Sequence, residues 1–217
     1  MILIRLGVWE AGSVTRMELD PAQIGPAASY SWLTQVVVPR PIAWVSSRSA
    51  TGVDNLAPHS FFTVSSQDPP VVQFTSVGRK DTLRNVEETG EFVVNVATQP
   101  LAMVVNETAT DFPRGMGEFD EVDVEREPSA LVRPPRVRAS PVALECVSVG
   151  FHPFGVGEAA STVVFGRVVR IAVDQAVVVD GRVDVTLLAP VARLGGPLWS
   201  TIGEVLTIRR KRYQAPG

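Results

Sequence analysis

The chain has 217 residues and a formal net charge of −3 at pH 7, a balance that provides no broad basic surface, so we expect no nucleic-acid binding. Apolar residues make up 45% of the chain and charged residues 20%, which is typical of globular proteins and excludes global disorder. The single cysteine, Cys146, excludes a disulfide framework, and one Cys with two His supplies too few ligands for a structural zinc site.

The apolar runs and the N-terminus indicate where the protein resides. No apolar run approaches the roughly 18–20 residues that a membrane-spanning helix needs. Residues 1–5 place only four apolar side chains before a charge, far fewer than a signal peptide requires. We therefore predict a cytoplasmic protein with no membrane contact. The pattern of elements tightens only after Met17, which predicts an N-terminal extension at residues 1–17 and one domain at residues 18–217.

Strands dominate the first half of the predicted structure. Valine occupies 37 positions, and β-branched side chains favour strands. An irregular helix is expected at residues 18–35, interrupted by Gly25 and Pro26. A second helix is expected at residues 81–89, ended by Gly90, and a short third one follows. The predicted strands occupy residues 42–47, 55–62, 71–76 and 91–97, and the short helix residues 101–108.

The second half contains a long excursion between strands. Residues 109–140 carry an acidic cluster and a Pro/Arg-rich stretch, which predict a surface excursion of functional or partner-covering type. Strands then resume at residues 142–150 and 162–173, and a hairpin turns at Asp180-Gly181. A loop at residues 190–196 and a solvated basic tail complete the chain. Because strands and helices do not alternate regularly, we predict a mainly β protein, a barrel with peripheral helices, rather than a parallel α/β sheet.

The sharpest local signal for a ligand is the start of the predicted helix at residues 81–89. A strand ends there in a turn containing Gly78, and the free N–H groups of a helix start bind anions. Arg79 and Lys80 stand at the positive end of this helix, opposing its dipole, and a bound phosphate would reverse that penalty of about 0.3–1 kcal/mol. The alternative is that these charges are simply exposed and screened by salt.

The strand at residues 55–62 mixes amide, imidazole and hydroxyl groups with aromatic rings. Such a strand can present hydrogen bonds to the edge of a heteroaromatic ligand, or its polar residues can face solvent in an ordinary barrel. His59 and Ser60 are adjacent, so they point to opposite faces of a strand, and no G-x-S-x-G motif supports a hydrolase. Trp44 is expected either to pack in the core or to flank a flat ligand. No Rossmann fingerprint is present.

Read in order, six segments resemble the flavin reductase-like family of FMN-binding split barrels, especially its flavoredoxin-like branch. They are residues 38–46, 55–62, 66–70, 79–85, 90–95 and 190–196. The resemblance spans about residues 28–200. It implies a split β-barrel with peripheral helices that binds FMN non-covalently near the interface of a homodimer.

The resemblance also assigns site residues. It implies that Lys80 and Thr82, with Ser76 and Arg79 nearby, hold the FMN phosphate. Four residues of the polar strand would run beside the isoalloxazine ring and ribityl chain, and Trp44 would pack nearby. The four are Asn55, Ala57, His59 and Ser60.

One position departs from the family pattern. Many NAD(P)H-using members carry Gly-Asp-His shortly before a Gly-x-Val strand, and that histidine is associated with the nicotinamide. Here the corresponding residue is Ser161, so use of NAD(P)H is less firmly implied than FMN binding. Trp199 stands where the branch often has Tyr, which keeps an aromatic surface.

Two functions follow from the resemblance. The first is an NAD(P)H:FMN oxidoreductase, a flavin reductase, that supplies a flavin-dependent monooxygenase or another redox protein. The cofactors carry the hydride chemistry, which fits the absence of an obvious catalytic side chain. The second is a flavoredoxin-like FMN electron carrier that accepts electrons from a protein donor.

Overall fold

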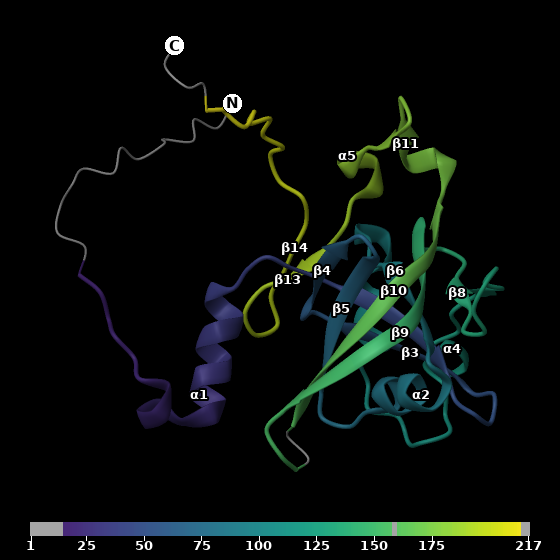
Figure 1. Ribbon diagram of the computed structural model, residues 1–217, viewed down its shortest axis with the longest axis horizontal. Helices are drawn as coiled ribbons and strands as arrows, with labels where there is room; N and C mark the ends of the chain where they lie inside the picture. Colours follow the sequence, from purple (N-terminus) through teal and green to yellow (C-terminus); the bar gives the residue numbers. More distant parts are fainter. Residues whose placement is uncertain (1–14, 158–159, 214–217) are drawn as a thin grey trace.

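The computed structural model describes residues 15–157 and 160–213. Its main element is a seven-stranded antiparallel sheet with the strand order β3-β2-β6-β9-β10-β5-β4, which curls into a barrel (Figure 1). The strands are β2 (Ala43–Arg48), β3 (Asp54–His59), β4 (Phe62–Gln67), β5 (Pro70–Val77), β6 (Glu91–Val96), β9 (Val142–Phe154) and β10 (Ser161–Val173). The expected barrel is therefore confirmed.

The barrel is open along one line. β3 and β4 lie at opposite ends of the strand order, although only Ser60 and Phe61 separate them in the chain. The Phe61 carbonyl accepts a hydrogen bond from the Thr75 N–H (2.9 Å), which draws this corner against β5. In the described residues no ladder joins β3 to β4 or β5, so the barrel is split beside β3.

The corner at Ser60-Phe61 corrects one prediction. A single strand was expected at residues 55–62, but β3 ends at His59 and β4 begins at Phe62. No cluster of glycine and proline marks this corner, and the sequence is strand-like on both sides of it. The bend is instead fixed by the non-local hydrogen bond to β5.

The core occupies both faces of β2. Ala43 and Val45 pack inside the barrel with Phe74, Phe92 and neighbouring side chains. On the other face of β2, Trp44 lies in a second cluster that is covered by the peripheral helices. A strand buried on both faces is a continuous apolar run rather than an alternating one, and residues 42–45 have that pattern.

The helices α1 (Pro21–Val36) and α2 (Asp81–Thr89) follow their sequence signals. Asp20 caps α1 by accepting a hydrogen bond from the Ala22 N–H (2.9 Å), and α1 is kinked at Gly25 (φ 79°) as expected. Gly90 (φ 73°) ends α2 in the left-handed conformation. α1 leaves the barrel, and the buried Arg40 side chain fastens its end by donating to the carbonyls of Thr34 and Val37 (Figure 1).

The excursion at residues 109–140 is more structured than a surface loop. It contains α4 (Glu118–Glu121) and a ladder of β7 (Arg126–Glu127) with β8 (Arg136–Val137). Phe119 is buried in it, and the fully buried Glu145 on β9 accepts hydrogen bonds from the N–H groups of Ala130 and Leu131. The acidic composition alone did not show this, because the packing partners lie far away in the chain.

The remaining elements are short. They are β1 (Arg40–Pro41), η1 (Gln99–Leu101), α3 (Ala102–Glu107), η2 (Gln175–Val177), β11 (Val178–Val179), β12 (Arg182–Val183), α5 (Val185–Leu188), β13 (Ala192–Arg193) and β14 (Trp199–Ser200). The hairpin at Asp180-Gly181 is confirmed. A loop was expected at residues 190–196, but this segment contains β13, which pairs with β1 and with β14. The local sequence does not reveal this pairing.

Two features of the predicted organisation concern the ends of the chain and the membrane. Residues 1–14 of the predicted N-terminal extension lie outside the described residues, and residues 201–213 are exposed and leave the barrel without forming helix or strand (Figure 1). Within residues 15–157 and 160–213, no helix combines the length and the apolar character needed to cross a membrane.

Candidate functional site

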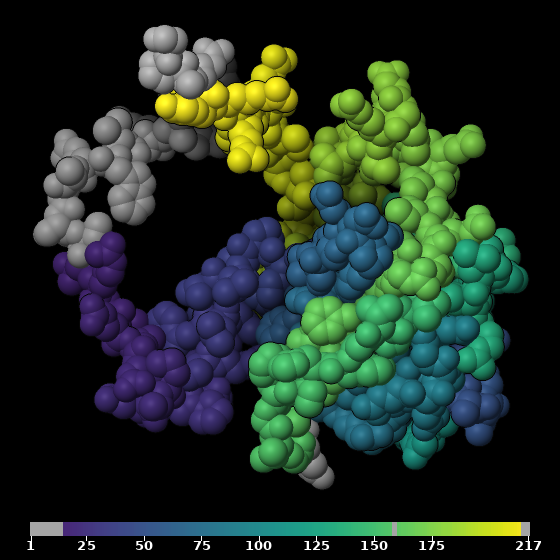
Figure 2. All heavy atoms as spheres, viewed as in Figure 1, coloured from purple at the N-terminus to yellow at the C-terminus, as the bar shows by residue number. Residues whose placement is uncertain are grey.

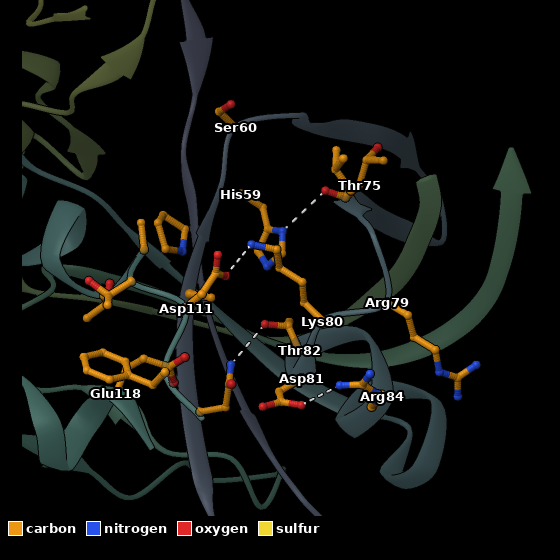
Figure 3. A pocket seen from close by; sticks show the side chains of 18 of the residues that line it. His59, Ser60, Thr75, Arg79, Lys80, Asp81, Thr82, Arg84, Asp111 and Glu118 are labelled. Carbon is orange, nitrogen blue, oxygen red and sulfur yellow. Dashed lines mark hydrogen bonds and ion pairs between the residues drawn. The ribbon is translucent and has the colours of Figure 1, made fainter. Parts of the chain in front are cut away.

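A cavity of about 440 Å³ opens at the split of the barrel, and we call it the α2 cavity (Figure 3). Its walls include residues 57–61 from β3 and the following corner, residues 79–82 from the start of α2, and residues 108–112 from the excursion. Its volume lies in the range of small-molecule and cofactor sites, about 300–1,000 Å³. The site is therefore built from three segments that are far apart in the sequence.

The structure brings seven of the predicted site residues to this cavity and leaves two outside it. Those that line it are Asn55, Ala57, His59, Ser60, Arg79, Lys80 and Thr82. Trp44 is fully buried in the core, where its indole N–H donates to the Thr108 hydroxyl (2.8 Å). Ser76 is also fully buried, and its hydroxyl donates to the Gly78 carbonyl (2.9 Å), which stabilises the turn before α2.

The start of α2 has the features expected of an anion site. Lys80 is the N-cap residue and makes no side-chain capping hydrogen bond, so the N–H groups of the first helical turn are not satisfied by the cap. The positive end of the helix dipole faces the same region. Three cations near this helix start are paired within the protein: Arg79 with Glu87 (2.8 Å), Arg84 with Asp81 (2.9 Å) and Lys80 with Asp111 (2.8 Å).

These ion pairs revise the argument from the helix dipole. The sequence places Arg79 and Lys80 at the wrong end of α2 for the dipole, and a ligand phosphate was one way to offset that cost. In the structure, Arg79 reaches along the helix to Glu87, an acid in the last turn of α2 that also opposes the dipole, so the two unfavourable charges neutralise each other. The Arg79 side chain points away from Lys80 and His59 (Figure 3). Both cations that precede α2 line the cavity, but Lys80 is the one whose side chain lies beside His59 (Figure 3).

His59 is the most unusual polar group at the cavity. Its ring is buried, its Nδ1 lies 3.3 Å from the Thr75 carbonyl oxygen, and its Nε2 has no partner in the part of the chain that is described. Burial, together with the smaller effect of the nearby Lys80 charge, lowers the pKa of His59 to about 4, so the ring is neutral at pH 7. Because Nδ1–H donates to Thr75, the unpartnered Nε2 is an acceptor. A buried acceptor without a donor is a place where a ligand group would be stabilised.

A hydrogen-bonded group connects β3, α2 and the excursion on one side of the cavity. Asn55 lies between Thr82 and Glu118, and the orientation of its amide that satisfies both neighbours donates to Glu118 Oε2 (3.3 Å) and accepts from the Thr82 hydroxyl (3.0 Å). Glu118 Oε2 also accepts from the Leu56 N–H (2.8 Å). Burial raises the pKa of Glu118. Thr82 therefore contributes mainly by fixing Asn55, since its hydroxyl proton is already used.

Sequence reasoning missed the contribution of the excursion. Asp111 and Glu118 both line the α2 cavity, as do Tyr30 from α1 and Thr75 from β5. The length of the excursion indicated a functional segment, but nothing local shows which of its acidic residues folds back toward α2. Among the described residues, no cluster of His, Cys, Asp and Glu could hold a metal ion.

The split barrel and its cavity define the class of protein, and the comparisons with known proteins identify its family. Residues 35–185 match the flavin reductase like domain, and the chain belongs to that family of FMN-binding split barrels. The predicted family and fold are thereby confirmed.

Three similar proteins illustrate the relationship. An uncharacterised protein from Halalkalibacterium halodurans is 36% identical over 89% of this chain and 96% of its own. The crystal structure of nitrilotriacetate monooxygenase component B from Bacillus cereus is 32% identical, with a TM-score of 0.86 over 90% of this chain and 100% of that one. The 2-nitrobenzoate 2-nitroreductase of Pseudomonas fluorescens is 30% identical, with a TM-score of 0.82 over 92% and 100% of the two chains.

Proposed function

We propose that this protein is a flavin reductase that holds FMN non-covalently in the α2 cavity and uses NAD(P)H as co-substrate. The observation that carries the proposal is that one cavity joins an uncapped helix start, the Lys80 cation and the unpartnered acceptor of buried His59. The family match supports the same cofactor. When bound, the flavin ring supplies the redox chemistry, which is acceptance of a hydride from the nicotinamide.

In this proposal the phosphate of FMN binds at the start of α2. The free N–H groups of the first turn donate to phosphate oxygens, and the helix dipole favours the negative charge. Lys80 adds a charge-assisted hydrogen bond. Arg79 contributes through its field rather than by contact, because it is paired with Glu87.

The ring of the flavin would lie along β3. The edge of β3 that faces away from β2 belongs to no ladder among the described residues. The Leu56 N–H on that edge bonds to Glu118, and residues two apart in a strand direct their backbone groups to the same side. The Pro58 carbonyl therefore points to the same side and provides an acceptor, while the small side chain of Ala57 leaves room for a planar ligand. His59 Nε2 is a second acceptor nearby.

We further propose that the working protein is a homodimer. α1 exposes Tyr30, Leu33 and Val36, each more than half exposed, and the segment at residues 201–213 exposes Leu206 and Ile208. Figure 2 shows α1 and this segment leaving the main body with open space between them. A two-fold dimer covers such surfaces on both copies at once. The partner that receives the electrons would be a flavin-dependent monooxygenase, as the name of the Bacillus cereus relative suggests.

A flavoredoxin-like electron carrier is the second candidate, and the observation that favours it is Ser161. This residue begins β10 opposite Val77 of β5, next to the cavity wall, where NAD(P)H-using relatives carry the histidine associated with the nicotinamide. Steady-state oxidation of NADH and NADPH with added FMN distinguishes the two. A flavin reductase oxidises at least one of them. A protein that binds FMN, oxidises neither and accepts electrons from a ferredoxin-like donor is the carrier.

Lys80→Ala tests the phosphate assignment. We expect this substitution to weaken FMN binding by about 1–3 kcal/mol, the scale of a charged hydrogen bond, and to leave riboflavin binding unchanged because riboflavin lacks the phosphate. The matched control is Lys211→Ala, which removes the other lysine of the chain from the exposed tail. Equal losses for FMN and riboflavin, measured by flavin fluorescence titration, would show that the phosphate lies elsewhere.

A further inference from the structure

Lys80 is held by a partner from another part of the chain. Its Nζ lies 2.8 Å from Oδ1 of Asp111, and both side chains are exposed at the α2 cavity. Figure 3 shows the pair spanning the space beside His59, with Lys80 from the start of α2 and Asp111 from the excursion. The pair therefore connects two walls of the cavity.

The other ion pairs at this end of α2 have a different character. Arg84 pairs with Asp81 within one helical turn, and Arg79 pairs with Glu87 along the same helix. Neither pair reaches the excursion. Lys80–Asp111 is thus the ion pair at the start of α2 that joins residues 109–112 to the helix in the described structure.

This pair is poised to exchange partners. Two exposed side chains, 54% for Lys80 and 85% for Asp111, form an ion pair that contributes little to stability because water and salt screen both charges. A phosphate dianion at the start of α2 would attract the same ammonium group and also gain the helix dipole. The phosphate would also repel the Asp111 carboxylate, because both groups are negative and both lie beside Lys80.

We propose that Asp111 competes with the phosphate of the ligand for Lys80, so that residues 109–112 form a displaceable closure over the α2 cavity. The inference rests on the proposed binding of FMN. A flavin with a phosphate must break the Lys80–Asp111 pair, and this cost lowers its affinity and speeds its release. Riboflavin leaves the pair intact. Asp111 thereby shifts the protein from retaining FMN toward exchanging it.

Asp111→Asn tests this competition, because it removes the charge and preserves the shape of the side chain. We expect FMN to bind about three- to fivefold more tightly, the upper range for an exposed ion pair, with a slower dissociation rate. Riboflavin affinity should stay within about twofold of wild type by the same reasoning. The matched control is Glu125→Gln, an exposed acid of the same excursion that is paired with Arg138 (3.2 Å) away from the cavity. It should change neither affinity.

Two further measurements identify the cause. In a Lys80→Ala background, Asp111→Asn should tighten FMN binding less than it does in the wild type, since only the direct repulsion between the phosphate and the carboxylate is then removed. Hydrogen exchange of the amides at residues 109–112 should increase with FMN and not with riboflavin. Unchanged or weaker FMN binding by Asp111→Asn overturns the inference, as does equal tightening of riboflavin. A wild-type protein that binds neither flavin overturns the proposed function itself, whereas one that binds FMN while Asp111→Asn has no effect overturns only this inference.

Discussion

The barrel and the elements that leave it differ in how completely their apolar and polar side chains are buried or hydrogen-bonded within the chain. Trp44, in the barrel, is fully buried and its one polar atom is hydrogen-bonded to Thr108. Trp32, on α1, is 39% exposed, and Ile208, in the segment at residues 201–213, is 86% exposed. The barrel is thus completed by its own packing, whereas the protruding elements present apolar side chains that no other described residue covers.

The α2 cavity lies between these two extremes. One side of the cavity is fixed to the barrel by the hydrogen bonds of Asn55 and Glu118. The cavity also contains the unpartnered Nε2 of His59 and the exposed ion pair of Lys80 with Asp111. Polar groups without hydrogen-bond partners and exposed apolar side chains therefore point to different kinds of binding partner. The polar cavity is where we propose that a small charged ligand binds, and the apolar protrusions are where we propose that a second copy of the chain packs.

The largest expected effect tests how much the packing of the barrel core contributes to stability. Trp44→Ala should lower the free energy of unfolding by about 3–5 kcal/mol, because it opens a cavity in a fully packed cluster and removes the hydrogen bond to Thr108. Urea denaturation measures the loss. Trp32→Ala, on the exposed face of α1, is the control and should cost far less. Comparable losses for the two would remove the distinction between barrel and protrusion.

The pH dependence of stability tests the buried His59. Its pKa falls from 6.5 in the unfolded chain to about 4 in the folded protein, so the unfolded state binds the extra proton first as the pH drops. The contribution of neutral His59 is complete above pH 6.5 and is lost as the pH falls from about 6.5 to about 4, by about 3 kcal/mol in total.

Denaturation curves of His59→Gln should therefore show a flatter loss of stability over this range than wild type. His152→Gln, which removes the exposed histidine of the hairpin formed by β9 and β10, is the control and should follow wild type. If His59→Gln and wild type lose stability in parallel between pH 6.5 and pH 4, His59 is not held neutral by burial.

The smallest of these effects tests the protruding elements. A chain ending after Ser200 should weaken dimer formation by about a hundredfold or more, since it removes the exposed apolar side chains of residues 201–208 from the proposed interface. The barrel should keep its circular dichroism spectrum. Sedimentation velocity at several concentrations measures the change.

The matched control ends after Ile208, which removes the basic residues and keeps the apolar ones. It should dimerise like the full chain. A dimer that survives both truncations would place the interface elsewhere. A dimer that both truncations disrupt equally would assign dimerisation to the residues after Ile208.

Much of the candidate site was predictable because its signals are local. The turn at Gly78, the cations before α2 and the polar residues of β3 are adjacent in sequence, and they line or border the α2 cavity together. The burial of Trp44 was one of the two outcomes that the sequence allowed, and its contact with Thr108 of a distant segment decided between them. The outward orientation of Arg79 was not predicted, because it depends on the ion pair with Glu87 near the other end of α2. Asp111 and Glu118 were missed because they reach the cavity from the excursion, which is distant in the sequence.

The sequence by itself determined the elements whose causes lie within a few residues: the cap and kink of α1, the start and end of α2, the hairpin at Asp180-Gly181 and the doubly buried strand β2. Only the tertiary structure decided where the chain turns between β3 and β4, how the excursion folds onto Glu145, and which acid meets Lys80. Local propensity acts through backbone sterics and nearby hydrogen bonds, whereas these features depend on contacts between residues brought together only when the barrel closes.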